Sequence, residues 1–331
     1  MIGYYAHHHG VGHLTRATSI AQHLDEPVVL LSSRAEPAQH EFADWVSLPL
    51  DTDTSDHPVD PTAGGALHWA PLGSDGLRER MNTIARWVTT ERPRLVVVDV
   101  SVEVALLVRL LGTPVAVTAM PGTRTDAAHT LAYRAATLIV APWSDRVYRP
   151  SWLAPFDHKV TYTGSISRFE GRARPPVRER GATPRILVLG GAGGSVLTPD
   201  DIDECRTVNP QFDWVSAGIG PNNWCDDVWP LLCDADVVVT HAGQNAIADV
   251  AAARTAAVIV AQDRPFDEQQ ATAQALSDNG IADTVASWPR PGDWPALVEA
   301  AAKRKPAGWS ELRVDGAAER GAAAVSSVPS R

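Results

Sequence analysis

The 331-residue sequence predicts an α/β protein made of two Rossmann-like, doubly wound domains. Short apolar runs rich in Val, Ile and Leu alternate with helical patterns, as in parallel sheets that are covered by helices. An Arg-, Pro- and Gly-rich segment interrupts this pattern near the middle of the chain. Because the length suits two domains of about 150 residues, we expect an N-terminal domain at 1–165, a linker at 166–184, a C-terminal domain at 185–305 and a tail at 306–331.

The N-terminal half opens with a strand that runs into a glycine-containing turn. The further elements that the pattern predicts are strands at 27–32, 95–98 and 114–118 and helices at 14–24, 77–90 and 101–111, with the pattern continuing at 135–141. Ligands bind at the carboxyl ends of strands in such sheets, where His13 and Asp99 both lie. A buried carboxylate needs a partner, and a histidine is a natural one for Asp99.

Two loops of this half invite a metal hypothesis. His7, His8 and His9 are adjacent, but successive side chains do not converge on one ion unless the loop wraps it, so we expect them to line a polar cleft. The D-x-D sequence at 51–53 lies in a long loop, and we interpret its carboxylates as solvated. We expect the loop at 50–77 to act as a lid over the substrate that serves as acceptor, with His68 and Trp69 contacting that substrate.

The C-terminal half repeats the pattern of a strand followed by a glycine turn. A strand at 185–189 leads into the glycine loop 190–195, and a strand ending near Val239 leads into His241-Ala242-Gly243 and a helix. Such a turn directs free N–H groups and the positive helix dipole toward a ligand, which suits a phosphate. Further strands are expected at 212–217, 257–261 and 282–286, a short helix after 225–228 and a helix at about 292–304. We expect the tail from Gly316 onward to fray.

Asp249 follows Gly243 by six residues on the predicted helix, on the order of 9 Å along its axis. A carboxylate at that distance from a diphosphate can accept hydrogen bonds from a ribose, and a solvated helix face is the alternative. Farther along, Asp263 is the expected N-cap of a helix that has Pro265 in its first turn. That helix brings polar side chains to a second strand exit, where sugar hydroxyls would fit.

These motifs resemble the GT-B glycosyltransferases. The chain is most similar to the family that includes the peptidoglycan N-acetylglucosaminyltransferase, and more distantly to glucuronosyl- and natural-product glycosyltransferases. The residues that carry the resemblance are Gly12-His13, His241-Ala242-Gly243, Asn245, Asp249 and Glu268-Gln269. The chain departs from the family pattern at Arg254 and Ala256, where the family often has Gly and Pro, and at Asp249, where Glu is more common.

The resemblance implies inverting transfer of a sugar from a nucleoside diphosphate, usually UDP, with no required metal and no cofactor. We expect His13 to be the base and Asp99 to orient it; a helix-capping or phosphate-binding role for His13 is the alternative. The donor-binding residues that the resemblance implies are Gly12, Gly191, Gly193, Gly194, Ser195, Cys225, His241, Ala242, Gly243, Gln244, Asn245, Asp249, Glu268 and Gln269. Within this set Cys225 would contact the base through its backbone, His241 the diphosphate, and Glu268 and especially Gln269 the sugar hydroxyls.

Composition narrows the partners. A formal charge of −10 argues against a general nucleic-acid binder. Three cysteines without a C-x-x-C pair fit a reducing cytoplasm. No apolar run reaches 18 residues and no signal peptide is apparent, so we expect a cytoplasmic protein with at most peripheral membrane contact. The acceptor stays open between a lipid carrier, a wall polymer and a small metabolite.

Two other functions fit the same pattern. A nucleotide-sugar epimerase would share the fold, and we would expect it to place more carboxylates and an arginine in the cleft. A non-catalytic nucleotide-sugar-binding protein would bind the ligand without turnover. A dinucleotide-dependent oxidoreductase is disfavoured, because Gly10-Val11-Gly12-His13 lacks the third glycine of the G-x-G-x-x-G motif.

Overall fold

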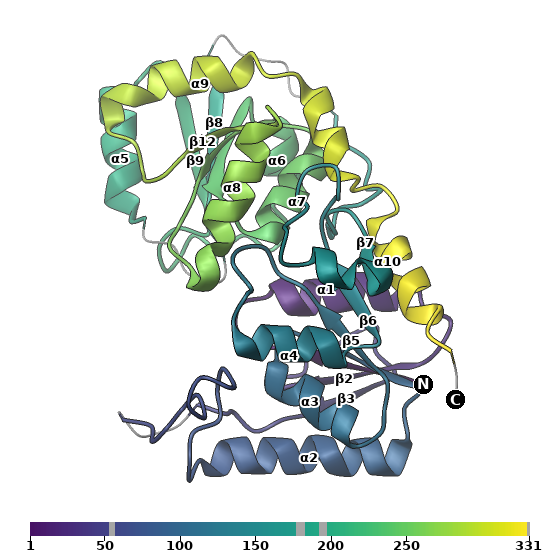
Figure 1. The fold of residues 1–331 in the computed structure, drawn as a ribbon. Helices are drawn as coiled ribbons and strands as arrows, with labels where there is room; N and C mark the ends of the chain where they lie inside the picture. Colours follow the sequence, from purple (N-terminus) through teal and green to yellow (C-terminus); the bar gives the residue numbers. More distant parts are fainter. Residues whose placement is uncertain (53–56, 177–182, 192–196, 330–331) are drawn as a thin grey trace.

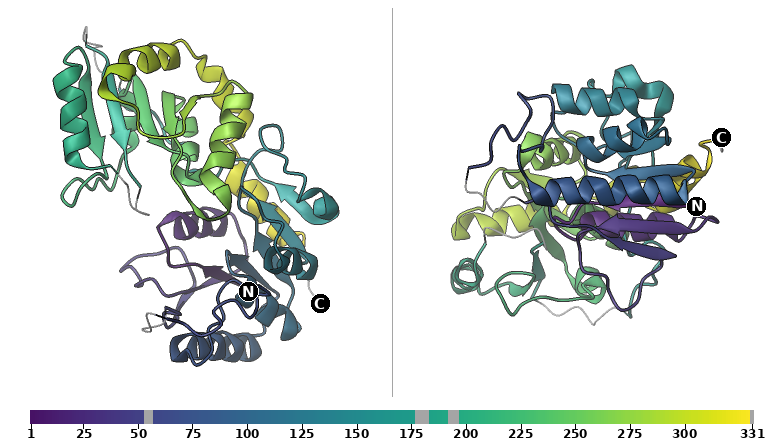
Figure 2. Two further views of the ribbon diagram at one scale, coloured as in Figure 1. Left: turned by 60° about the vertical axis from the view of Figure 1, so that its left-hand side comes forward. Right: turned by 90° about the horizontal axis from the view of Figure 1, so that it is seen from below.

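Two parallel sheets organise the chain, one in each half (Figure 1). The structure is a computed structural model that describes residues 1–52, 57–176, 183–191 and 197–329. Figure 2 shows the two halves from further directions, with both termini on the N-terminal half. The predicted α/β class with two doubly wound domains is therefore confirmed at the level of the two sheets.

The N-terminal sheet has the strand order β3-β2-β1-β4-β5-β6-β7 within the described residues. Its strands are β1 (Ile2–Ala6), β2 (Val28–Ser32), β3 (Asp44–Ser47), β4 (Leu95–Asp99), β5 (Val115–Thr118), β6 (Leu138–Ala141) and β7 (Val160–Tyr162). Its helices are α1 (Gly12–Ala21), α2 (Asp75–Glu91), α3 (Val102–Leu110), α4 (Ala127–Ala135) and the 3-10 helix η1 (Ala154–Lys159). The short edge strands β3 and β7 were not predicted from the sequence, since neither has a continuous apolar run.

The C-terminal sheet has the order β12-β11-β10-β8-β9 within the described residues. Its strands are β8 (Arg185–Leu189), β9 (Asp213–Ala217), β10 (Val237–His241), β11 (Ala256–Val260) and β12 (Asp283–Val285). The helices around it are α5 (Pro199–Val208), α6 (Trp229–Asp234), α7 (Gln244–Ala253), α8 (Glu268–Asp278) and α9 (Trp294–Ala302), with 3-10 helices η2 (Pro265–Asp267), η3 (Pro291–Asp293) and η4 (Pro306–Leu312).

Each sheet reverses its strand order at one point, and the candidate site residues follow the strands on either side of it. In the first sheet the reversal lies between β1 and β4, where Ala6 pairs with Asp99. In the second it lies between β8 and β10, where Leu189 pairs with Thr240. Loops diverge at such a point and leave a crevice at the carboxyl ends of the strands, so this topology positions a ligand site in each half.

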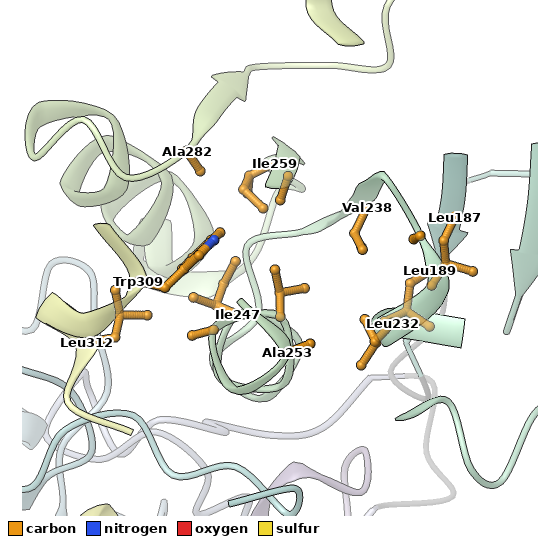
Figure 3. Packing of buried hydrophobic residues seen from close by; sticks show 14 of the residues in the cluster. Leu187, Leu189, Leu232, Val238, Ile247, Ala253, Ile259, Ala282, Trp309 and Leu312 are labelled. Atoms are coloured by element: carbon orange, nitrogen blue, oxygen red, sulfur yellow. The ribbon is translucent and has the colours of Figure 1, made fainter. Parts of the chain in front are cut away.

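The C-terminal core closes around helix α7. Figure 3 shows Ile247 of α7 between Val238 of the sheet and Trp309 and Leu312 of η4. Trp309 is almost fully buried, and its Nε1 donates to the carbonyl of Thr255 at 2.9 Å. This packing fixes the start of α7 relative to β10, which is where a phosphate is expected to bind.

The predicted helix cap in this half is corrected. Asp263 is not a helix N-cap, because Pro265–Asp267 forms the separate turn η2 and α8 begins at Glu268 with Asp267 as its N-cap. Phe266 and Asp267 both have positive φ, so the chain changes direction there before the helix starts.

The Arg-, Pro- and Gly-rich composition of the linker predicts a solvated hinge, but its described part contacts the C-terminal half. In the described part of the linker, Arg172 pairs with Asp227 and Arg174 donates to the carbonyl of Ala253. Arg172 and Arg174 therefore fasten the described part of the linker to the surface of the C-terminal half.

The C-terminal segment was expected to fray, but it forms a packed helix instead. Helix α10 (Ala317–Ser326) returns to the N-terminal half and packs on α1 and β6 (Figure 1). Val325 is fully buried, and Gly321 lies so close to Ile20 that an added Cβ would be 3.3 Å from that side chain. Small residues weaken the hydrophobic pattern in the sequence, but here they permit close helix packing.

Within the described ranges, no helix is both long enough and apolar enough to cross a bilayer.

The packing of α10 predicts that Val325→Ala lowers the free energy of unfolding by about 2 kcal/mol, because it removes two buried methyl groups and leaves a cavity. Urea denaturation followed by circular dichroism measures this change. The matched control is Ser326→Ala at the next, exposed position, for which a change within about 0.5 kcal/mol is expected. Equal effects of the two substitutions would show that the segment is frayed in solution.

Candidate active site

A cleft between the two halves collects most of the predicted site residues. Its walls include Gly12 and His13 from the β1–α1 loop and the first turn of α7 from the other half. The predicted residues that line it are Gly12, His13, Gly191, Cys225, His241, Gly243, Gln244, Asn245, Asp249 and Glu268. Asp99, Ala242 and Gln269 lie behind these walls, and Gly193, Gly194 and Ser195 lie outside the described residues.

The predicted His13–Asp99 pair is present. Nδ1 of His13 lies 3.0 Å from Oδ1 of Asp99, which is fully buried. Two further partners were not predicted from the sequence: Arg16, whose Nε donates to Asp99 Oδ2 at 2.9 Å, and Tyr4, whose hydroxyl donates to the same oxygen at 3.3 Å. Burial opposes ionisation of Asp99, but the charge of Arg16 and the bonds from His13 and Arg16 outweigh it and lower the pKa of the carboxyl.

Arg16 also joins the two halves. Its Nη1 donates to Oε1 of Gln244 at 3.2 Å, at the first residue of α7. Nearby, Nδ2 of Asn245 donates to the carbonyl of Gly12 at 3.4 Å. Arg16 lies three residues after His13 on the same helix, and this spacing could have indicated a second polar residue facing Asp99. The contact between Arg16 and Gln244 could not be predicted from the sequence.

His241 shapes the loop at the end of β10. Its Nδ1 accepts a hydrogen bond from the amide of Gly243 at 3.0 Å, so Nε2 carries the ring proton. Burial, with repulsion from Arg264, lowers its pKa to about 4, and the ring is therefore a neutral donor at pH 7. A Cβ at Gly191 would lie 2.4 Å from Nε2, so a side chain at this position would displace the His241 ring.

Gln269 braces the same loop from behind. It is 3% exposed, and its Oε1 accepts from the amides of Ala242 (3.1 Å) and Gln262 (3.0 Å). Its carboxamide oxygen is thus occupied by backbone groups of the two strand exits. The first turn of α7 remains available to a ligand, because its N–H groups have no intrahelical partner and Gly243 provides no side-chain cap.

Asp249 lies at the cleft wall but is 6% exposed, which contradicts the solvated-face alternative. Its two oxygens accept hydrogen bonds from Ser167 Oγ at 2.7 Å and Arg168 Nε at 3.3 Å, both in the segment that joins the halves. Burial raises its pKa to about 6 against the opposing effect of these partners. A carboxylate can accept about four hydrogen bonds, so two positions remain for an incoming hydroxyl-bearing ligand.

Glu268 connects the cleft with the N-terminal half. Its Oε2 accepts from Arg124 Nη2 at 3.3 Å, and burial raises its pKa although Arg124 opposes the shift. Phe266, two residues before Glu268, packs on the same region, since its carbonyl accepts from the Thr123 amide at 2.7 Å and its ring lies 4.5 Å from the Arg124 guanidinium. A Cβ at Gly122 would lie 2.1 Å from that carbonyl, so this contact requires glycine.

Cys225 lines the cleft on the C-terminal side, and its thiol donates to the carbonyl of Asp227 at 3.3 Å. Its side chain is therefore turned to its own loop. This arrangement leaves a backbone contact with a ligand possible at this position.

A second cavity adjoins the cleft on the N-terminal side and shares His9 and Met120 with it. The predicted lid contacts His68 and Trp69 line this cavity. Asp51 lines it too, but is paired with the buried Arg80 at 2.8 Å rather than solvated; the other carboxylate of the D-x-D sequence lies outside the described residues.

Two groups on the walls of this cavity have metal-ligating atoms within 4.8 Å of one another. They are His7, His8 and His9, and His68, Asp126 and His129. The rings of the first group are mutually stacked or tilted at 4.5–5.0 Å between centroids. The second group is already a hydrogen-bonded network, because Asp126 accepts from both of its histidines.

The burial of Asp249 predicts that Asp249→Asn stabilises the ligand-free protein at pH 7.5 by about 3 kcal/mol, since each pKa unit corresponds to about 1.4 kcal/mol. The pKa of Asp249 rises from 3.8 in the unfolded chain to about 6 in the fold. The folded carboxyl thus holds its proton more tightly, and stability falls as the pH rises from about 4 to about 6.

Urea unfolding at pH 4 and pH 7.5 tests this prediction. The increase in the free energy of unfolding caused by Asp249→Asn should be clear at pH 7.5 and small at pH 4. Asp203→Asn, at an exposed position of α5, is the control and should show little change between the two pH values. A gain from Asp249→Asn that is the same at both pH values would contradict the raised pKa.

Comparisons with known proteins agree with this architecture. Residues 209–287 match the family model of the glycosyltransferase family 28 C-terminal domain. The search of curated proteins found no match to the chain. One similar solved structure is the glycotransferase of kitacinnamycin, with a TM-score of 0.67 and 16% sequence identity, covering 99% of this chain and 97% of that one. Another is MurG from Acinetobacter baumannii, with a TM-score of 0.63 and 17% sequence identity, covering 98% of each chain.

A further similar structure is assigned as a UDP-N-acetylglucosamine 2-epimerase from Listeria monocytogenes (TM-score 0.64, 12% identity, covering 98% of this chain and 96% of that one). At these identities the likeness concerns the fold alone. The chain has the GT-B fold, and its residues 209–287 match the C-terminal domain of glycosyltransferase family 28.

Proposed function

We propose that the protein transfers a sugar from a nucleoside diphosphate sugar, with UDP as the expected nucleotide, to an acceptor hydroxyl with inversion. The observation that carries this proposal is the meeting of two features in one cleft: the His13–Asp99 pair from one half and the uncapped N-terminus of α7 from the other. A base for the acceptor and a positive site for the leaving group are the two requirements of the reaction.

The diphosphate would lie against the first turn of α7. The amides of Gln244, Asn245 and Ala246 and the helix dipole attract negative charge there. The neutral His241 adds an Nε2–H donor beside Gly191. These groups provide positive potential for the leaving group without requiring a metal ion.

The rest of the donor would extend along residues that line the same cleft. Asp249 has acceptor positions for the ribose hydroxyls, and the backbone at Cys225 is available to the base. Glu268, at the start of α8, is the better candidate for the sugar hydroxyls, because Gln269 already bonds two amides of the loop. The sequence-based preference for Gln269 over Glu268 is thus reversed in this proposal.

His13 would act as the base through Nε2. Because Nδ1 faces the Asp99 carboxylate, whose pKa is lowered, the ring proton belongs on Nδ1 and the lone pair on Nε2. As the acceptor oxygen attacks the anomeric carbon, Nε2 takes its proton, and Asp99 stabilises the resulting imidazolium. Arg16 keeps Asp99 ionised for this task.

A cytoplasmic location is part of the proposal. Cys205, Cys225 and Cys233 are all free thiols, which fits a reducing compartment.

An epimerase acting on a nucleotide sugar is the second candidate. The observation that favours it is the charge in the cleft, where Arg16, Arg168 and Glu268 join Asp249 on the walls. Such an enzyme would need no acceptor. Incubation with UDP-N-acetylglucosamine alone, followed by proton NMR, distinguishes the two, since a new epimeric UDP sugar would appear only with the second function.

The proposed transfer predicts that His13→Ala separates binding from catalysis. UDP should still raise the melting temperature by mass action, whereas slow hydrolysis of the UDP sugar in the absence of acceptor should fall by about a hundredfold or more. Asp249→Ala is the converse variant and should lose the UDP-induced shift. No stabilisation of the wild-type protein by any nucleoside diphosphate would refute the proposed function.

A further inference from the structure

The cavity beside the cleft has the size and position of a second substrate site. Its volume is about 740 Å³, within the range that encloses a small organic molecule. It shares His9 and Met120 with the donor cleft, and the His7 ring on its wall lies 6.2 Å from the His13 ring. A hydroxyl group at this end of the cavity is therefore near the proposed base.

Aromatic rings dominate the walls of this cavity. Tyr133 comes from α4 and Trp69 from the loop before α2, and Phe266 reaches in from the C-terminal half. Phe266 lies against His68 and His129 at 5.4 and 4.8 Å between ring centroids. Flat side chains in this arrangement favour a planar ligand, because aromatic rings attract one another in stacked and edge-to-face contacts.

The charges on these walls are negative. Among the described residues that line the cavity there is no lysine and no arginine. Asp51 is neutralised by Arg80. Within the described part of the chain, Glu103 accepts only from the amides of His68 and Trp69 and from a serine hydroxyl. No cation is paired with the Glu103 carboxylate in these contacts.

Asp126 adds a second negative charge. Burial opposes its ionisation, but hydrogen bonds from the His129 amide, the His129 ring and His68 outweigh that effect and lower its pKa. Burial lowers the pKa of His129 to about 4 and of His7 to about 3, so these rings are neutral at pH 7. His7 and His129 thus provide hydrogen-bonding groups and flat surfaces rather than positive charge.

We propose that this cavity binds the sugar acceptor, and that the acceptor is a small aromatic hydroxyl compound without negative charge. The inference rests on the proposed function and names the substrate class of that reaction. An acceptor bearing a phosphate or carboxylate would lose hydration beside Asp126 and Glu103, and no cation stands among the described lining residues. Arg124 lies behind Phe266 and His129, where it is paired with Glu268. This excludes phosphate-bearing carriers and favours a small metabolite among the open acceptor classes.

In the reaction the acceptor O–H bond breaks and its proton moves to Nε2 of His13. The acceptor oxygen forms a bond to the anomeric carbon, and the bond from that carbon to the diphosphate breaks. The bonding electrons leave with the nucleoside diphosphate, so no oxidant or further reactant is needed. Phe266 belongs to the half that holds the donor, so the aromatic wall is complete only when the halves are together.

Three matched probes test the substrate class with the full-length protein: a hydroxynaphthoate methyl ester, the corresponding free acid and an aminomethyl naphthol. Isothermal titration calorimetry at pH 7.5, with and without UDP, measures their binding. The ester and the amine should bind at least about tenfold more tightly than the acid. Equal or tighter binding of the acid would overturn the inference, as would the failure of both the ester and the amine to bind.

Two variants locate the effect in this cavity. Asp126→Asn keeps a good helix cap for α4 but removes the charge. It should reduce the ratio of the dissociation constants of acid and ester by about fivefold. Asp157→Asn removes the same charge at a surface pair with Arg149 and should leave the difference unchanged. If both variants change the difference in affinity between ester and acid equally, the overall charge of the protein and not the cavity determines that difference, and the inference fails.

Phe266→Asn provides an independent check that does not depend on charge. Asparagine tolerates the positive φ of this position, so the variant removes the ring while keeping the turn. Binding of the ester should weaken by about tenfold, and unchanged binding would place the probe elsewhere. UDP titrations on the same samples separate the two proposals: UDP binding without probe binding refutes only the acceptor class, and the absence of UDP binding refutes the proposed function.

Discussion

The buried carboxylate of Asp99 is the group on which the arrangement of the cleft depends. A charge removed from water must be compensated by several partners, and here they come from β1 and α1 as Tyr4, His13 and Arg16. Arg16 then extends to Gln244 at the start of α7. One electrostatic requirement in the N-terminal sheet therefore orients a candidate base and also connects it to the opposite half, where the donor is expected to bind.

The fold was largely predictable because both sheets are buried on their two faces. Runs such as 95–98 and 237–239 are apolar throughout, and a polar or glycine residue follows each of them. The same regularity places His13, Asp99 and His241 at strand ends before any coordinates are known. His13 follows β1 and Asp99 ends β4, and these two strands are neighbours in the sheet. The contact between His13 and Asp99 could therefore be predicted as well.

What the sequence did not indicate depends on contacts between distant segments. Gln269 has the position of a sugar-binding residue in the resembling family, yet its oxygen bonds two backbone amides. Asp249 lies on a helix face that could equally have been solvated, and its burial comes from Ser167 and Arg168. Such roles are decided by which segment covers a side chain, and local patterns of hydrophobicity contain no information about that.

The return of α10 to the N-terminal half has a consequence for protein engineering. The chain passes between the halves twice, once before β8 and once after η4, so the N-terminal half is not one continuous segment of sequence. A chimaera that exchanges N-terminal halves at the linker alone would pair Ile20 with a foreign helix in place of the one containing Gly321. Exchanges of the N-terminal half should therefore transfer residues 316–328 together with residues 1–165.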